Sequence, residues 1–444
     1  MFKLSSRPRC VDNAGMAKTF RPYDPDQLLL MPPALADWVP EDHLARFVSD
    51  VVDTLDLMAI EETYAEERGY PPYHPQMMVK VLLYGYCTGI YSSRRIARQL
   101  TDSVAFRFLA AGNQPDFRTV SEFRKRHGTA LAALFQQVLR LCRRAGLVKL
   151  GQVAVDGTKI KANASKHKAM SYRRMQEADA ALTAEVAELL RRAEAADHDE
   201  DARYGPDQRG DELPAELARR ESRLAKIREA KAALEAEARA QAQADGKPRD
   251  DARPPDKAQR NFTDPESKIQ KTSDGFIQGY NAQVVVDATA QVIVAQHVTA
   301  ASPDAEQLQP AVRALIRGLH RRPRVLLADA GYWSEANVVA LQDRGIEVFI
   351  ATGRRTHREP PARAPRGRPP SGLTVKQRMV RSLATRRGHA VYARRKAIVE
   401  PPFGQIKHAR GFRQFLRRGL QAVQEEWALI CTSHNLLKLY GART

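Results

Sequence analysis

The sequence has few cysteines and no long apolar run. Its 4 cysteines among 444 residues, Cys10, Cys87, Cys142 and Cys431, lie far apart and form no Cys-x-x-Cys pair. This spacing fits neither a zinc site nor a disulfide framework, so we expect a reducing, cytoplasmic location. No stretch approaches the roughly 18–20 apolar residues that cross a membrane. The N-terminus also lacks the apolar core of a signal peptide, and we expect no membrane partner.

Charge is unevenly distributed along the chain. The formal net charge is +19, and residues 351–444 hold 21 Lys and Arg but 4 Asp and Glu. This region therefore supplies +17 of the total, which favours a polyanionic partner, most simply nucleic acid. The alternative is a solubilising or disordered basic tail. The aromatic residues Tyr392, Phe403, Phe412 and Phe415 are interleaved with the charges and favour an ordered, binding segment.

The pattern predicts an all-helical domain over residues 20–150, preceded by a disordered extension at 1–19. Met16 is a candidate start residue, because the 15 residues before it match none of the sequence blocks described below. Ser92 or Ser93 can cap one helix, and Thr119 with Glu122 forms a capping-box pattern for the next. Short basic helices with tight turns are compatible with a helix-turn-helix DNA-binding module. Plain structural packing of a small bundle predicts the same pattern.

Residues 151–350 predict an α/β core with a mixed sheet flanked by helices. Apolar, β-branched runs alternate with helical patterns, first as an antiparallel meander and then through right-handed crossovers. Residues 166–250 are rich in Ala, Glu, Arg and Leu and predict a helical-hairpin insertion. That insertion is either a solvated addition or an arm for oligomerisation or DNA guidance. A Pro/Arg-rich linker at 351–375 precedes C-terminal helices at 376–444 that we expect to complete the core.

Three carboxylates stand out by context. Asp156 ends the predicted strand QVAVD, Asp329 ends VLLAD, and Glu400 lies on or beside a helix. Catalytic groups of open α/β sheets gather beyond the carboxyl ends of strands, so the three could converge. Carboxylates bind hard divalent cations, which phosphodiester chemistry requires. The structural alternative is that the aspartates form caps and turns, while Glu400 pairs with Arg394 or Arg395.

Several blocks of the sequence resemble bacterial DDE-type insertion-sequence transposases. The blocks are VAVDGTKIKANAS, NFTDPESKIQKTSDGFIQGYNAQVVVD, VLLADAGYWSEANV and YARRKAIVEPPFGQIKHARGFRQFLRRGL, and residues 23–48 and 69–97 resemble that family's N-terminal helical domain. The resemblance implies a ribonuclease-H-like catalytic domain. It also implies cutting and joining of double-stranded DNA with two Mg²⁺ or Mn²⁺ ions held by Asp156, Asp329 and Glu400.

The same resemblance implies partners and further contacts. The DNA would be the terminal inverted repeats and the target, bound by a homodimer or larger synaptic complex in a bacterial cytoplasm, in association with the nucleoid. Lys407 occupies the signature place seven residues after Glu400, while Tyr392 and Arg395 lie one residue farther from it than the commonest spacing. Basic residues elsewhere complete the expected DNA contacts: Lys159, Lys161, Arg410, Arg94 and Arg95.

Two rival functions use the same features. A ribonuclease-H-like nuclease would cut DNA without joining it, and a non-catalytic regulator would bind DNA but would have no use for acids at strand ends. A tyrosine recombinase is disfavoured, because the additional Arg and His boxes that activate its phosphate are not found here.

Overall fold

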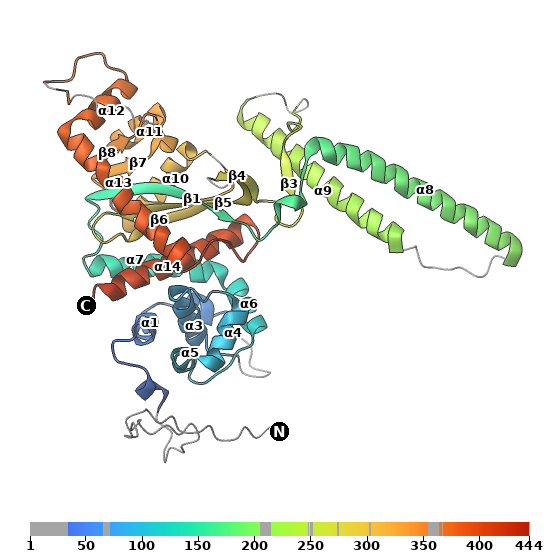
Figure 1. The fold of residues 1–444 in the computed structure, drawn as a ribbon, viewed down its shortest axis with the longest axis horizontal. Coiled ribbons are helices and arrows are strands. Elements are labelled where there is room, and N and C mark those ends of the chain that lie inside the picture. The colour runs from blue at the N-terminus through green and yellow to red at the C-terminus, as the bar shows by residue number, and fades with distance from the viewer. Residues whose placement is uncertain are drawn as a thin grey trace, which may run out of the picture.

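The structure is a computed structural model, which describes residues 34–64, 72–204, 215–246, 248, 252–272, 275–301, 303–353, 364–365 and 367–443. The extension expected at 1–19 and much of the linker expected at 351–375 lie outside these residues. Figure 1 shows N-terminal helices beneath a sheet-containing core, with a long helical hairpin projecting from one side. No helix in the described part of the chain has the length and apolar character needed to cross a bilayer.

The N-terminal region is helical, as expected. A 3-10 turn, Leu35–Trp38, is followed by α1 (Leu44–Asp53), α2 (Met58–Glu61), α3 (Pro75–Cys87), α4 (Ser93–Asp102), α5 (Val104–Leu109), α6 (Phe117–Arg126) and α7 (Gly128–Arg144). Helix α3 is buried on nearly all sides, which explains its continuous apolar sequence. The short helices α4 to α6 are joined by tight turns, and their role in DNA binding stays a prediction.

The predicted capping box is wrong. Helix α6 begins at Phe117, and Asp116 is its N-cap, with the carboxylate accepting from the Thr119 backbone N–H at 2.7 Å. Thr119 is therefore already inside the helix. Aspartate is among the strongest N-cap residues, so the earlier acid takes the position that the Thr-x-x-Glu pattern suggested for Thr119.

The core contains a mixed sheet with the strand order β4-β5-β1-β7-β8, and β6 also pairs with β5. The strands are β1 (Gln152–Lys161), β4 (Lys268–Thr272), β5 (Gly275–Asp287), β6 (Ile293–Thr299), β7 (Val325–Ala328) and β8 (Glu347–Ile350). Strands β1, β5 and β6 are antiparallel neighbours, while β7 and β8 run parallel to β1. The ribonuclease-H-like mixed sheet flanked by helices is thus confirmed.

Two details of the predicted strands are wrong. Strand β1 does not end at Asp156 but continues for five residues, because β5 pairs with it from Val153 to Lys161. The sequence pattern also misses a short strand, β3 (Gln259–Asn261), which pairs with β2 (Ala169–Ser171). Neither short strand has the apolar alternation that marks a strand in sequence.

The remaining helices surround the sheet. They are α10 (Leu308–Leu319), α11 (Glu335–Gln342), α12 (Val375–Ala384), α13 (Arg386–Gly404) and α14 (Leu420–Gly441), with a π-helical turn at Gln405–Ala409. Helix α11 is capped by Ser334, as its sequence predicts. The insertion forms two helices, α8 (Tyr172–Tyr204) and α9 (Ala215–Ala244), which pack together in a small apolar cluster of their own.

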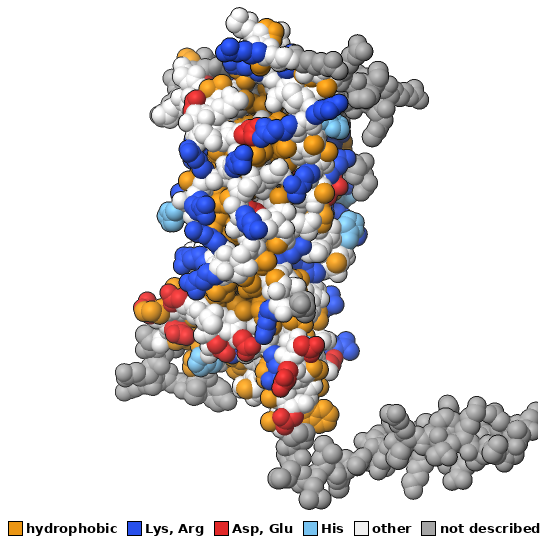
Figure 2. Space-filling model, turned by 90° about the vertical axis from the view of Figure 1, so that its left-hand side faces the viewer, with side chains coloured by type: hydrophobic (Ala, Val, Ile, Leu, Met, Phe, Trp, Pro, Cys, Tyr) orange, Lys and Arg blue, Asp and Glu red, His pale blue; other side chains and the backbone are white. Residues whose placement is uncertain are grey.

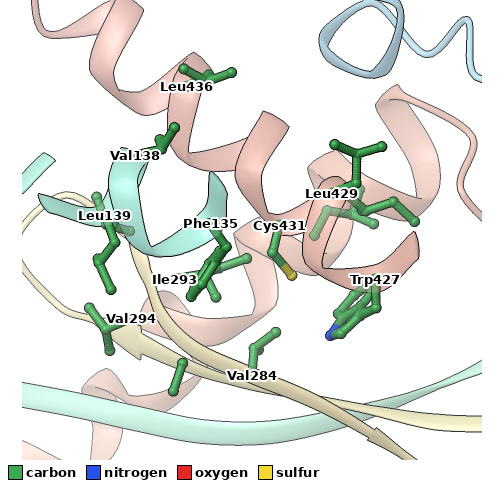
Figure 3. Close-up of a cluster of buried hydrophobic side chains, with 14 of the residues drawn as sticks. Phe135, Val138, Leu139, Val284, Ile293, Val294, Trp427, Leu429, Cys431 and Leu436 are labelled. Carbon is green, nitrogen blue, oxygen red and sulfur yellow. The ribbon is translucent and has the colours of Figure 1, made fainter. Parts of the chain in front are cut away.

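Helix α14 ties the N-terminal helices to the sheet. It packs against α7 and α3 and also against β6. Figure 3 shows Trp427 and Cys431 of α14 beside Phe135 of α7 and Val284 of β5. Trp427 is fully buried, and its indole N–H donates to the Gln283 carbonyl oxygen at 3.2 Å. The N-terminal and C-terminal segments therefore share one continuous core.

We expect Trp427→Ala to lower the free energy of unfolding by about 3–5 kcal/mol, because it opens a large cavity at this junction. The midpoint of urea unfolding measures the loss. Val339→Ala on α11, where the side chain is 42% exposed, is the control and should change the midpoint little. Equal midpoints for the two variants would contradict a structural role of α14 at this junction.

Candidate active site

The pairing register of β1 and β7 brings two of the predicted acids together. Ala154 of β1 pairs with Leu327 of β7 in parallel register. Asp156 and Asp329 each lie two residues farther along, and Asp329 keeps an extended backbone at φ −79° and ψ −179°. Side chains alternate between the two faces of a sheet, so both carboxylates project from the same face on neighbouring strands.

The charge state of Asp156 reflects this neighbour. The pKa of the Asp156 carboxyl is raised to about 6, mainly by burial and also by the negative charge of Asp329, while Arg395 opposes both effects. The Arg395 guanidinium donates to Asp156 Oδ2 at 3.2 Å, and the Gly157 backbone N–H donates to Oδ1 at 2.8 Å. Two carboxylates that share a partly buried place favour binding of a proton or a metal cation between them.

Helix α13 supplies the groups that face these acids. It packs across β1, β5 and β7, with Arg395 at Asp156. Pro401 and Pro402 lie inside the helix, where they remove backbone donors. The Ala397 carbonyl that Pro401 leaves without a helical partner accepts instead from the Gln291 side chain at 2.9 Å. A contact from the β5–β6 turn thus supports the unusual helix.

The π-helical turn after α13 positions Lys407. Its ammonium donates to Thr158 Oγ1 at 3.0 Å and to the Lys159 carbonyl oxygen at 3.3 Å. Arg395 and Lys407 therefore contact β1 on either side of Glu400 along the helix. Such π-turns are frequent at functional sites.

Glu400 is placed on α13, as expected, but its side chain is exposed. Within the described residues its carboxylate makes no hydrogen bond or ion pair. Arg394 binds Gln152 and Arg395 binds Asp156, so neither arginine forms the pair with Glu400 that the structural alternative required. The structural alternative also expected the aspartates to form caps and turns. Asp329 does so, because its carboxylate accepts from the Gly331 N–H at 2.8 Å and caps a short turn.

Tyr392 lies within electrostatic range of Asp329. It is half-buried one turn before Arg395. Burial raises the pKa of its hydroxyl, Arg395 lowers it and the charge of Asp329 raises it again. Tyr392 and Arg395 therefore both face the acid pair, although their spacing from Glu400 departs from the family's usual pattern.

The sequence analysis missed a further acid, Asp304. Its Oδ1 accepts from the side chains of Asn281 at 2.7 Å and Gln283 at 2.9 Å. A Cβ built on Gly331 would lie 3.5 Å from Asp304 Oδ2 and 3.1 Å from Asp329 Oδ1, so the two carboxylates flank the same space. In sequence Asp304 precedes a helix and looks like an N-cap, which concealed it, although an acid soon after a strand is the available signal.

Lys159 lies beside the acids, whereas a DNA contact requires an ammonium group at the surface. Its ammonium is buried and lies 3.6 Å from Asp304 Oδ1. Burial lowers the pKa of Lys159, while the charges of Asp304, Asp156 and Asp329 raise it. The ammonium thus serves as a counter-charge to the acids and is not presented to a phosphate at the surface.

The other expected DNA contacts divide into exposed and buried. Lys161 is exposed on β1, and Arg94 and Arg95 are exposed on α4. Arg410 is only 7% exposed and its guanidinium donates to Ser433 Oγ at 2.6 Å, which favours a structural role over the predicted phosphate contact. Arg410 joins α14 to the N-terminal helices, and composition alone could not distinguish that role from phosphate binding.

The residues at this site fit a divalent cation in part. Asp156, Asp329 and Asp304 bring three carboxylates, against which Lys159 and Arg395 bring two positive charges. Oxygen ligands and excess negative charge are what Mg²⁺ and Mn²⁺ prefer. However, among the residues that the structure describes, no three His, Cys, Asp or Glu side chains are close enough to hold an ion together.

Two family models match parts of this chain. Residues 33–126 match the family described as Transposase domain (DUF772), and residues 249–436 match Transposase DDE domain. An 85-residue stretch is 42% identical to the putative transposase for insertion sequence element IS402 of Burkholderia cepacia. That alignment covers 18% of this chain, and the chain spans only 40% of the relative's length. No solved structure matches the chain.

We expect Asp156→Asn to raise the melting temperature in EDTA at pH 8 but hardly at pH 4. The pKa of Asp156 is about 6 in the folded protein and ordinarily 3.8. The folded state is therefore destabilised as pH rises from about 3.8 to about 6, and this destabilisation is complete above pH 6. The uncharged amide removes that destabilisation, and each kcal/mol recovered corresponds to roughly 1 °C for a chain of 444 residues that unfolds in one step. Thermal scans at both pH values measure it, with the exposed Asp343→Asn as control. A gain that is equal at pH 4 and pH 8 would contradict the raised pKa.

Proposed function

The chain belongs to the DDE-type transposases of insertion sequences, and we propose that it cuts and joins DNA at the ends of such an element. The observation that carries the proposal is the parallel register that sets Asp156 beside Asp329, together with the raised pKa of Asp156. Paired, partly buried carboxylates on the edge of a basic protein are suited to phosphodiester chemistry, because the basic surfaces hold the DNA backbone.

Asp156 and Asp329 would hold a divalent cation, Mg²⁺ or Mn²⁺, and Glu400 would add a third carboxylate and allow a second ion. When bound, such ions activate the attacking oxygen and stabilise the leaving one. Glu400 lies on α13 between Arg395 and the turn that carries Lys407, and the proposal requires its exposed side chain to move toward the two aspartates. Asp304 is the competing candidate for the third carboxylate.

The chain's own side chains would position the reacting groups. Arg395 fixes one oxygen of Asp156 and so sets the direction of the other. Lys407 and Tyr392 flank the same region of α13 and are suited to binding phosphates next to the scissile bond. Hydrolysis frees a 3′-hydroxyl that then attacks the target strand, so no protein nucleophile is needed. Positioning and electrostatics would supply most of the rate.

The proposed substrates are terminal inverted repeats and target DNA. The N-terminal helices, with the exposed Arg94 and Arg95, would bind the repeats together with Lys161 near the site. Joining two ends requires them to be held together, so the active form would be a homodimer or larger complex. A nuclease that cuts without joining is separated from this proposal by a strand-transfer assay with pre-cut ends.

We expect Asp156→Asn, Asp329→Asn and Glu400→Gln each to reduce cleavage by several orders of magnitude while leaving end binding largely intact. Each substitution removes a charge that would hold the cation and changes the shape little. Cleavage and strand transfer are measured with Mg²⁺ and Mn²⁺ on duplexes made from the DNA that flanks the gene.

Two further variants sharpen this test. Asp304→Asn tests which residue supplies the third carboxylate. If Asp304→Asn loses cleavage while Glu400→Gln keeps full activity, the third carboxylate is Asp304 and not Glu400. Asp343→Asn is the matched control on an exposed surface. Retained strand transfer in Asp156→Asn or Asp329→Asn would overturn the proposed mechanism, and binding of the ends without any metal-dependent nicking would favour a regulator.

A further inference from the structure

A basic cavity lies at the end of the sheet opposite to the acids. Its volume is about 930 Å³. The charged residues around it come from α10, from the loop before β7 and from the turn after α11: Arg313, Arg317, His320, Arg321, Arg322 and Arg344. No acidic side chain lines it. Strand β7 separates this end from Asp329, a distance of roughly 16 Å at the usual rise per strand residue.

The cavity is held by specific contacts. Arg322 donates to the Arg344 carbonyl oxygen at 2.6 Å. Its guanidinium also lies over Gly345, where φ is +72° and an added Cβ would be 2.9 Å from the Arg322 Nη1. A larger residue at 345 would thus be strained and would displace the arginine. The Nη1 of Arg344 is buried without an acceptor, a costly state that an anionic ligand would relieve.

The positive charges of this cavity are uncompensated. Within the described part of the chain none of its five arginines forms an ion pair, whereas Arg387 and Arg417 elsewhere each pair with a glutamate. Like charges gathered around one space repel each other, so a bound anion would stabilise the arrangement. Arginine is also the side chain whose planar fork best matches phosphate oxygens.

The basic surface extends beyond the cavity. Arg143 of α7 reaches the C-terminal end of α10, where it donates to the Leu319 carbonyl oxygen at 3.3 Å, and Arg144 and Lys149 nearby are exposed. Figure 2 shows the left-hand side of Figure 1, on which the chain passes from α7 to β1. Lys and Arg side chains gather there over the level of the sheet, while Asp and Glu gather lower, over the N-terminal helices.

We propose that this cavity and its surroundings bind the phosphate backbone of a DNA duplex away from the cleavage site. Arg313 and Arg317 lie one turn apart on α10 and His320 is its C-cap, so the three span roughly 10 Å, which suits successive phosphates of a strand better than one small anion. Contacts to phosphates carry no sequence information, so the surface binds DNA irrespective of sequence. The inference rests on the proposed function, because it adds a second DNA contact to a DNA-processing enzyme.

The test compares Arg313→Glu/Arg317→Glu with Arg219→Glu/Arg223→Glu, an exposed pair with the same spacing on α9. Binding of the full chain is measured by fluorescence anisotropy over a salt series. One labelled duplex carries an inverted repeat and the other does not. For the α10 variant we expect a rise in Kd of roughly tenfold and a fall of about 2 in the slope of log K against log salt. The α9 variant, with the same change in net charge, should keep the slope.

The two duplexes identify the source of the bound DNA. Loss confined to the duplex without the repeat supports contact with a separate target, and equal loss on both supports contact with the duplex that carries the end. The inference would be overturned if the salt slope of the α10 variant did not change, or if the α9 variant lost as much affinity. The proposed function would still stand in either case, provided that the wild type binds the duplex with the repeat. A wild type that binds neither duplex would overturn both. Arg313→Gln/Arg317→Gln, with circular dichroism of all variants, separates lost contacts from misfolding.

Discussion

The parallel pairing of β1 with β7 is the constraint on which the site depends. Only a short register, from Gln152 to Ala154, holds the two strands together. It nevertheless sets two acids that are 173 residues apart in sequence side by side on one face of the sheet. A shift of one residue would turn one carboxylate to the opposite face. Strand β5, which pairs with β1 over nearly its whole length, fixes the position of β1 in the sheet.

Helix α13 depends on the same arrangement, since it lies across β1 and contacts it through Arg395, and the π-helical turn after α13 adds the contacts of Lys407. Arg395 contacts Asp156 itself, and Lys407 uses the part of β1 that continues past Asp156. The extension of the strand therefore shapes the candidate site, because it provides the Thr158 hydroxyl and the Lys159 carbonyl oxygen that accept from Lys407. The acid, its arginine and the lysine thus form one unit held by two secondary-structure elements.

Much of this could be predicted from the sequence, because apolar periodicity reports which faces are buried. It gave the order of strands and helices, the antiparallel-then-parallel sheet and the acid at the end of β7. It failed where partners distant in sequence decide the outcome. Strand β1 extends because β5 pairs with it, Arg410 is buried because α14 packs on α3, and Asp304 approaches Asp329 only through tertiary folding. Charge pattern alone cannot separate a buried arginine from one that binds phosphate.

The long insertion leaves and rejoins the core through adjacent strands. Ala169 of β2 pairs with Asn261 of β3, so the chain returns to the place from which it departed. The two helices bury their apolar side chains mainly against each other. Evolution can therefore lengthen, shorten or replace this hairpin without altering the register of β1 or the core beneath it. The hairpin is in effect an exchangeable module, and its length can diverge between relatives while the catalytic sheet stays unchanged.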